Sequence, residues 1–437
     1  MLIKLFKLIA KTFFREITVK GLENLSKSDP AIFTPNHPNA LLDPLFLYFL
    51  SPQYKIRFVA KAPLFKISFL GWIMHRIGVI PVVRKFEAEG KVDYKVFFSS
   101  CVDTLAAGES IVIFPEGVSL PQPHMSPLKT GVARLFFLAT ERDLAIQIVP
   151  VGLNYEHGSI FRSSVVVSIA PPLDTDDLTE KYKTFPQAAV RDLTDRISQV
   201  LQEHVFQSEN ARDRELMLLL EQIYSVGKND NSWRERFERL RQFEIGLKSL
   251  STSHSSEIER LRQMLLKYMK ISKTIQISKS MPKGNACYSP KRFLMAISGF
   301  PIAGLGWLLT IIPYQLCNLF VKYIKQYDAS DAATYKVVYS LFLFPVTFFL
   351  ETLFVHLWLG WLASLTFAIG IIPISYFTLY YLEWVDEGGW GIPNFSMKLR
   401  KNMLDRVAKQ LENERSGIIE LVSELAGWLE QNPKKMG

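Results

Sequence analysis

The chain has 437 residues, enough for two or three domains, and its 48% hydrophobic residues are concentrated in the C-terminal half, which indicates membrane spans rather than one larger core. Its net charge of +9 favours anionic partners, such as phosphate-bearing substrates, acidic lipids or an acidic carrier protein. Nucleic acid is disfavoured, because there is no zinc-finger spacing, no RNA-binding signature and no dense basic tract.

The N-terminal segment, residues 1–16, has the pattern of a basic amphipathic helix. Lys4, Lys7 and Lys11 recur at near-helical spacing among Leu, Ile and Phe. The segment has no uninterrupted apolar core and no small-residue cleavage site, so a signal peptide is disfavoured. We expect a helix that lies in the membrane interface; the alternative is a helix packed on the protein's own core.

Residues 17–208 have the pattern of an α/β domain. Short runs rich in Val and Ile alternate with longer helical patterns, which predicts a mostly parallel central sheet. The expected strands are residues 17–19, 31–34, 56–60, 79–83, 111–114, 146–153 and 165–169. An amphipathic stretch from Pro186 to Phe206 is expected to be the last helix, so we place the end of the domain near Ser208.

Residues 209–292 are charged and carry no catalytic signature. Polar breaks at 227–232 and 251–256 predict three helices up to residue 276, followed by a basic linker. We expect this helical extension to brace the catalytic domain or to space it from the membrane. The alternative is a surface for a dimer partner or a carrier protein.

A membrane region is expected over residues 293–382. Segment 293–321 is long enough to span once, but its glycines and prolines also allow it to dip in and return. Stretch 337–382 fits two spans with a tight turn near Gly360. Lys and Arg flank all of these segments, which favours a re-entrant first segment and a through-going hairpin over three spans.

The remaining residues, 383–437, are expected to form a cytoplasmic amphipathic tail. The chain is therefore expected to be a multi-pass integral membrane protein whose catalytic domain faces the cytoplasm. The membrane would be the bacterial inner membrane, or an endomembrane in a eukaryote.

Segment 36–46, NHPNALLDPLF, supplies a candidate base. His37 follows an apolar strand, so its imidazole can project from the strand end into a crevice. Pro44 disfavours a helical Asp43, so we expect the chain to break there and the carboxylate to fold back to the ring. A carboxylate on one nitrogen makes the other a general base. Alternatively, Asp43 caps a helix through Leu50 and His37 is a loop histidine.

Charged residues also follow other predicted strands. Glu116 and Gly117 directly follow a buried strand, at an edge where open α/β sheets bind ligands. Arg84 ends another strand, and a guanidinium can grip a phosphate with two hydrogen bonds. Lys129 precedes a predicted helix whose N-terminus attracts anions. Each could alone be a cap or a solvated charge, but their repeated position at strand ends predicts an anion-binding crevice.

These residues resemble the glycerolipid acyltransferases, which include glycerol-3-phosphate and 1-acylglycerol-3-phosphate acyltransferases. The resemblance covers roughly residues 30–170 and rests on the order of NHPNALLDPLF, GVIPVVR, IFPEGVS and IVPVGLNY. It implies a glycerol-3-phosphate acyltransferase-like α/β domain in which His37 and Asp43 are the catalytic pair. It implies that Arg84, Glu116 and Gly117 help to bind the acceptor's phosphate and that Pro150 shapes the acyl-side wall. It also implies that Lys61 and Lys129 lie near the anionic substrate.

Two departures from the family pattern bear on the acceptor. Five residues separate His37 from Asp43 instead of the usual four, as in the subgroup that resembles glycerol-3-phosphate or dihydroxyacetone phosphate acyltransferases. The sequence VSLPQP replaces the common Arg-Ser after the third motif. The acceptor's identity therefore stays open.

The motifs supply a base without an evident nucleophile. There is no GxSxG elbow, and neither Cys101 nor Cys287 has a histidine nearby in the sequence. We therefore expect His37 to deprotonate an acceptor hydroxyl that attacks an acyl thioester directly, with neither metal nor organic cofactor.

The expected function is O-acyl transfer from acyl-acyl-carrier protein or acyl-CoA to glycerol 3-phosphate or a related phosphorylated acceptor, at the lipid bilayer, in phospholipid biosynthesis. One alternative is a 1-acylglycerol-3-phosphate acyltransferase that makes phosphatidic acid. Others are a non-catalytic membrane tether and a transporter that uses Glu351 and His356 within the spans. The transporter hypothesis leaves the first 200 residues unexplained.

Overall fold

The structure is a computed structural model that divides into two units. One comprises residues 1–211 with 327–334, and the other comprises residues 212–326 with 335–437. The residues that it describes are 2–25, 29–40, 42–50, 54–66, 68–83, 94–158, 160–226, 232–251, 253–275, 290–323, 332–388 and 401–431.

The first unit is built on one sheet, and each of the expected strands is present. The strands are β1 (Phe14–Lys20), β2 (Ala31–Pro35), β3 (Ile56–Lys61), β4 (Ile80–Val82), β5 (Ser110–Val112), β6 (Gln147–Tyr155) and β7 (Ser163–Ile169). Their order in the sheet is β1-β7-β6-β2-β5-β3-β4. From β6 to β4 neighbouring strands are parallel, whereas β7 runs antiparallel to β6 and parallel to β1. The prediction of a mostly parallel sheet is confirmed.

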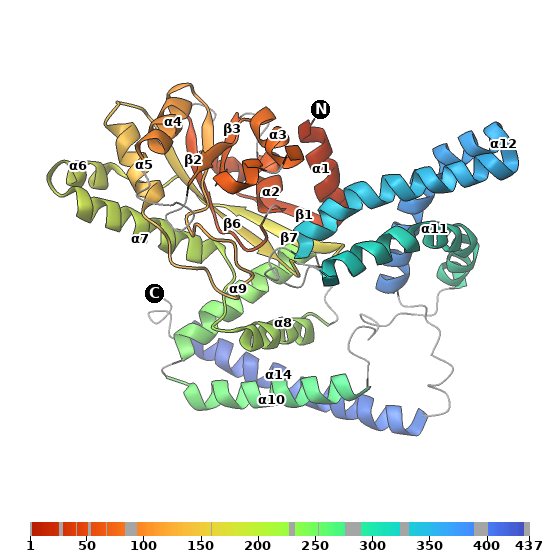
Figure 1. Cartoon of the computed structure of the whole chain (residues 1–437). Coiled ribbons are helices and arrows are strands. Elements are labelled where there is room, and N and C mark those ends of the chain that lie inside the picture. Colours follow the sequence, from red (N-terminus) through yellow and green to blue (C-terminus); the bar gives the residue numbers. More distant parts are fainter. Residues whose placement is uncertain are drawn as a thin grey trace. The chain divides into compact units, whose positions relative to one another are not determined.

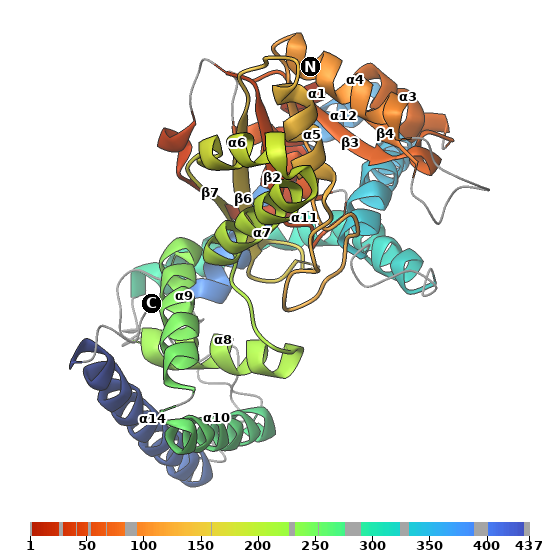
Figure 2. The same cartoon turned by 90° about the vertical axis from the view of Figure 1, so that its left-hand side faces the viewer.

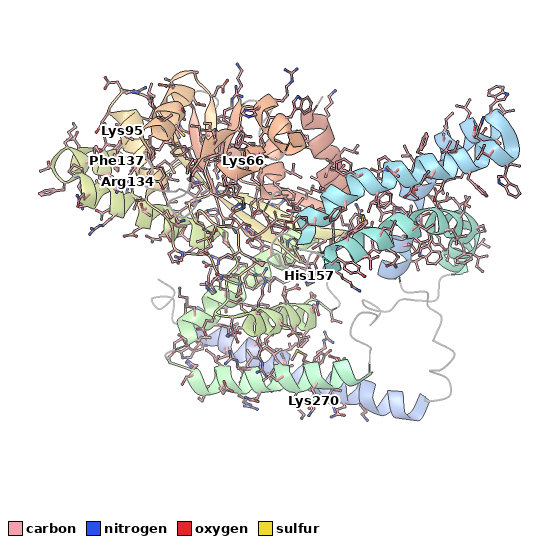
Figure 3. All side chains as sticks on the ribbon, in the orientation of Figure 1. Lys66, Lys95, Arg134, Phe137, His157 and Lys270 are labelled. Atoms are coloured by element: carbon pink, nitrogen blue, oxygen red, sulfur yellow. The ribbon has the colours of Figure 1, made fainter. Side chains whose placement is uncertain are left out.

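Helices cover both faces of this sheet. One face carries α4 (Lys95–Ala106), α5 (Gly131–Thr140), α6 (Asp176–Thr184) and α7 (Pro186–His204), which lie in front of the strands in Figure 2. Their apolar side chains form one cluster with Ile32, Ile111 and Ile148 of the sheet. Phe137 of α5, labelled in Figure 3, stacks on Tyr182 of α6 with ring centroids 4.1 Å apart. This interleaving fixes the helical layer that supports the strand ends.

The opposite face carries α1 (Leu2–Phe13), α2 (Leu42–Leu50) and α3 (Ser68–Arg76) (Figure 1). Two 3₁₀ turns, η1 (Leu22–Asn24) and η2 (Ala62–Lys66), join elements in this unit. Phe14 at the start of β1 meets Phe46 of α2 edge to face at 5.0 Å. These buried rings hold α2 against the sheet.

The N-terminal helix is shorter than the expected 1–16, because it ends at Phe13 and Phe14 begins a strand that pairs with β7. The guanidinium of Arg162 donates to the carbonyls of Lys11, Thr12 and Phe14, and so satisfies acceptors that the helix end leaves open. Phe13 is buried while Leu8 is exposed. One face of α1 therefore packs on the protein and another is available to the surroundings.

The second unit contains a helical cluster. The three helices expected for the extension are α8 (Ala211–Ser225), α9 (Trp233–Leu250) and α10 (Ser255–Ile275), and α14 (Lys401–Gln431) packs against them. Leu220, Leu265 and Ile418 lie in the shared apolar core. The expected C-terminal tail is therefore a structural part of the extension. Fully buried Glu221 is paired with the guanidinium groups of Arg236 and Arg239 at 2.7 and 2.9 Å.

The second unit also holds two helices that are long and apolar enough to cross a membrane, α11 (Pro290–Tyr323) and α12 (Ala332–Gly388). Helical geometry in α12 is interrupted at Gly360, which has a φ of 82°. His356 Nδ1 lies 3.3 Å from Ser364 Oγ. Residues eight apart in a straight helix are separated by about 12 Å, so the chain reverses at Gly360, where the sequence predicts a turn.

The two ends of α11 contact the two arms of α12 at matching levels. The hydroxyl of Tyr381 on the second arm donates to the carbonyl of Ala296, and Phe320 lies 5.5 Å from Tyr339 on the first arm. Tyr381 and Tyr339 are the same number of residues from Gly360, so they lie at the same distance from the turn along their two arms. A straight helix from Ala296 to Phe320 would extend about 36 Å, so α11 does not run alongside the arms over its whole length.

Candidate active site

The loop after β2 carries the first site residue. Asn36 accepts a hydrogen bond from the Leu153 amide at 2.6 Å and donates to the Leu153 carbonyl at 3.1 Å, which fastens the end of β2 to β6. The chain then turns sharply: Ala40 has a φ of +41°, and its amide donates to Ser119 Oγ at 2.8 Å. Helix α2 begins two residues later. His37 therefore lies in a pinned loop at the carboxyl edge of the parallel strands.

The imidazole of His37 and the carboxylate of Asp43 form a close pair. His37 Nδ1 lies 2.7 Å from Asp43 Oδ2, and the Asn39 amide donates to the same oxygen at 2.8 Å. The other oxygen, Oδ1, accepts the Tyr155 hydroxyl. Asp43 is fully buried, whereas 16% of the His37 side chain is exposed. The carboxylate thus accepts three hydrogen bonds, and its place in the first turn of α2 adds favourable interaction with the helix dipole.

The way the two residues meet differs from the prediction. Asp43 is helical, within α2, so Pro44 does not break the chain there. The reversal occurs instead at Asn39 and Ala40, where Leu42 N donates to the Asn39 carbonyl at 3.0 Å. Proline is tolerated in a first helical turn because its missing N–H has no partner to lose there. The predicted pairing of the two side chains is present, but by another backbone route.

The contacts of His37 define its useful nitrogen. With Nδ1–H donated to Asp43, the neutral ring has its lone pair on Nε2, which can accept a proton. Phe114 stacks on the imidazole with centroids 3.9 Å apart and planes 20° from parallel. The ring is therefore oriented by a hydrogen bond at one edge and by an aromatic face.

Glu116 ties together the loops around the pair. Its Oε1 accepts the His37 amide and its Oε2 accepts the Ser126 amide, each at 2.8 Å. Burial raises the pKa of Glu116, and the hydrogen bonds from Ser126 and His37 oppose that rise. Both oxygens are thus committed to backbone N–H groups, including that of the residue that carries the candidate base.

Gly117 and Lys129 lie together beside this network. Gly117 has a φ of +67°, and a Cβ built on it would lie 2.8 Å from Lys129 Nζ. The Lys129 amide donates to the Pro115 carbonyl at 2.8 Å, which holds the segment before α5 against the loop after β5. The absence of a side chain at Gly117 therefore leaves room for a cation close to the N-terminus of α5.

The other expected residues are less closely associated. Lys61 is the exposed last residue of β3, at the same edge of the sheet. Pro150 is buried within β6 beside Thr34, in the body of the sheet rather than at its edge. Arg84 lies outside the described residues.

Sequence reasoning assigned no role to three side chains that contact the pair or its loop: Phe114, Ser119 and Tyr155. All three belong to the quoted motifs. The position of Tyr155 at the end of an apolar run is the kind of signal that marked His37 and Glu116. Its contact with Asp43 depends on β6 lying next to β2, which the sequence did not predict.

Comparisons with known proteins find relatives of the segment that carries His37 and Asp43. Residues 16–154 match the family model described as Acyltransferase. The chloroplastic 1-acyl-sn-glycerol-3-phosphate acyltransferase LPAT1 of Arabidopsis thaliana is 32% identical over 151 residues, which cover 34% of this chain and 39% of the relative. Glycerol-3-phosphate O-acyltransferase 2 of Saccharomyces cerevisiae is 32% identical over 139 residues, covering 31% and 18%.

One relative matches over a longer stretch. An uncharacterized acyltransferase of Schizosaccharomyces pombe is 24% identical over 304 residues, covering 65% of this chain and 45% of the relative. The crystal structure of the 1-acyl-sn-glycerophosphate acyltransferase PlsC from Thermotoga maritima aligns with a TM-score of 0.33 and 17% identity, over 45% of this chain and 76% of that one. This chain spans about two fifths of the length of the plant relatives. Residues 16–154 thus match an acyltransferase domain, and the named relatives are consistent with the glycerolipid acyltransferase superfamily.

Proposed function

We propose that this chain is an O-acyltransferase that moves a fatty acyl group from a thioester donor to the hydroxyl of glycerol 3-phosphate or a closely related phosphorylated acceptor, in phospholipid biosynthesis. The observation that carries the proposal is the His37–Asp43 pair, with Nδ1 held by a buried carboxylate and Nε2 left as the proton acceptor. The pair lies at the carboxyl edge of the sheet, inside the region that matches the acyltransferase family.

The proposed step is direct transfer. His37 Nε2 takes the proton of the acceptor hydroxyl while that oxygen forms a bond to the thioester carbonyl carbon. The carbon–sulfur bond then breaks, and the thiolate takes the proton from the imidazolium. Asp43 keeps the ring in the tautomer that this step needs and stabilises the transient positive charge.

The acceptor's phosphate would lie near Lys129, Gly117 and the N-terminus of α5. The lysine brings positive charge, the missing side chain at Gly117 lets the Lys129 side chain lie against this loop, and the helix terminus favours anions. Lys61 would add charge at the same edge, and the resemblance assigns Arg84 to phosphate binding. We assign Glu116 to positioning the His37 loop rather than to the phosphate, because both of its oxygens already accept backbone hydrogen bonds.

A second acceptor is favoured by a specific observation. The plant relatives are named 1-acyl-sn-glycerol-3-phosphate acyltransferases and the yeast relatives glycerol-3-phosphate O-acyltransferases, at similar identity over this domain. Phosphatidic acid is therefore the alternative product. The deciding assay crosses acyl-CoA and acyl-acyl-carrier protein with glycerol 3-phosphate, dihydroxyacetone phosphate and lysophosphatidate on membranes containing the protein. Absence of acylated product in every combination, from folded protein, would refute the enzymatic function in favour of a tether or transporter.

We further propose that α12 crosses the bilayer as a hairpin and that α11 enters and leaves on one side, with the catalytic domain on the cytoplasmic face. Packing of α10 against α14 supports this, because helices sharing an apolar core lie in one aqueous compartment. The chain between them must then cross the membrane an even number of times, which disfavours three spans. The contacts of Ala296 and Phe320 at matching levels of α12 support the same arrangement.

Labelling of single cysteines tests this topology. In a cysteine-free background, replacements of Tyr323 and Gly388 should react only from the cytoplasmic side, and a replacement of Gly360 only from the opposite side. Reaction of positions 323 and 388 only from the far side, with position 360 reacting only from the cytoplasmic side, would support three spans instead.

A further inference from the structure

We propose that Tyr155 is a positioning residue of the catalytic pair: its hydroxyl holds the Asp43 carboxylate in the orientation that makes His37 a base. The inference rests on the proposed acyl transfer and deepens it, because it adds a third side chain, from the fourth motif, to the reacting group. Tyr155 acts through Asp43 and touches no substrate in this scheme.

The two oxygens of Asp43 have separate partners. Oδ2 receives His37 Nδ1–H and the Asn39 amide, whereas Oδ1 receives the Tyr155 hydroxyl. A carboxylate held at only one oxygen can rotate about its χ2 torsion, because the wells of such sp³–sp² torsions are broad. The Tyr155 contact fixes the second oxygen, and thereby the direction in which Oδ2 meets the imidazole.

Tyr155 is itself held firmly. Its ring lies 5.7 Å from those of Phe14 and Phe46, which are both buried and contact one another. Two residues earlier, Leu153 is fastened to Asn36 by a pair of hydrogen bonds, so the end of β6 is fixed against the loop that carries His37. A hydroxyl supported in this way can orient a carboxylate more precisely than a side chain on a loose loop.

The charges around the pair set the sign of the expected effect. Within the described part of the site, His37 faces the carboxylates of Asp43 and Glu116, and Lys129 lies beside Gly117. Burial, followed by the negative charge of Asp43, holds the pKa of Tyr155 well above its ordinary value, so the phenol stays a neutral donor. Its hydrogen bond disperses charge on Asp43. Removing it should leave a carboxylate that favours the imidazolium more strongly and should raise the pKa of His37.

The test is Tyr155→Phe in the full-length protein on membranes. We expect kcat to fall roughly 10-fold, with KM changed less than about 2-fold, because the lost contact serves the chemical step. The acid limb of the pH profile of kcat/KM should move to higher pH. The matched control is Tyr182→Phe, which removes a hydroxyl that also interacts with a carboxylate, that of Glu141, away from the site.

A readout independent of turnover separates this proposal from the proposed function. Modification of His37 by diethyl pyrocarbonate at a series of pH values, followed by mass spectrometry of its peptide, reports the pKa of the ring. If wild-type protein transfers no acyl group, the proposed function fails, and this titration still tests Tyr155. Wild-type kcat, acid limb and titration in Tyr155→Phe would overturn the proposal.

A purely structural role is distinguishable as well. It would reduce the amount of folded protein while leaving turnover per folded molecule and the acid limb unchanged, and that result would also overturn the proposal. If Tyr155→Phe is not recovered folded, 3-fluorotyrosine at position 155 keeps the ring and provides a stronger donor. The pKa of His37 should then shift to lower pH, and an unchanged pKa would contradict the inference.

Discussion

The sheet of the first unit and the helices α11 and α12 are both rich in apolar residues. In the sheet these side chains are buried inside the protein, whereas in the two helices most of them face outward. In the sheet, Ile32, Phe33 and Ile111 are fully buried among helices on both faces. In α12, Leu357, Trp358 and Trp361 beside the Gly360 turn are mostly exposed. Apolar side chains removed from water by protein can hold polar groups precisely at strand ends, whereas outward-facing ones require an apolar surrounding such as lipid. Amino-acid composition alone does not distinguish apolar residues of a protein core from apolar residues that face lipid, whereas their burial in the structure does.

The largest expected effect is at the strand ends. His37→Ala should lower acyl transfer roughly 10²-fold or more, because it removes the general base without disturbing the core. Initial rates on membranes, normalised to folded protein, measure it. Near-normal turnover in this variant would show that His37 is not the general base, and that the buried residues around it do not serve to position one.

Two matched substitutions to arginine test whether the exposed apolar side chains of α12 are surrounded by lipid. Phe349 in α12 and Phe185 beside α7 are 66% and 62% exposed. If α12 is surrounded by lipid, Phe349→Arg should cost about 3 kcal/mol of membrane insertion, while Phe185→Arg should be nearly neutral. Extraction of membranes with alkaline carbonate compares the two. Equal behaviour would mean that both faces meet water.

A smaller loss of activity is expected when Glu116, which binds the backbone of the His37 loop, is replaced. Glu116→Ala leaves the amides of His37 and Ser126 without their acceptor, so the loop should loosen and kcat should fall about 10-fold. Steady-state kinetics measure the change, with Glu180→Ala, which removes an exposed partner of Lys183, as the control. If KM for the phosphorylated acceptor rises while kcat is kept, Glu116 serves substrate binding instead.

The smallest expected effect concerns the exposed cation of the site. Lys129→Ala should raise KM for the phosphorylated acceptor by a few-fold, since an exposed charge contributes modestly to binding, and Lys129→Arg should restore most of it. Varying the acceptor concentration at saturating donor measures this. Unchanged KM in Lys129→Ala would make Lys129 a solvated surface residue.

Strand positions and the identity of the central pair could be predicted, because both depend on local patterns. The strands of the first unit follow runs of Val and Ile, and His37 and Asp43 stand in one short segment. The backbone route between them could not be predicted. It depends on a positive φ at Ala40, a conformation that alanine rarely adopts and that its neighbours Asn39 and Ser119 stabilise here.

Contacts between distant segments were the other missing part. Tyr155 reaches Asp43 only because β6 lies beside β2, and α14 packs against α10 although α11 and α12 lie between them in the sequence. Neither pairing has a local signature, since the residues involved look like ordinary core positions. The end of α1 was misplaced for the same reason: Phe14 fits an amphipathic helix by spacing, but pairing with β7 makes it a strand residue.

The packing of α14 against α8 and α10 also imposes an order on biosynthesis. The seven strands of the sheet and the helices that cover it lie within residues 2–204, so this part can fold while the apolar helices are still being made. The cluster of Leu220, Leu265 and Ile418 must wait until α14 has been translated. A chain that stalls or is truncated before α14 would therefore carry a folded catalytic domain but expose the apolar faces of α8 and α10, a form that quality-control proteases can recognise.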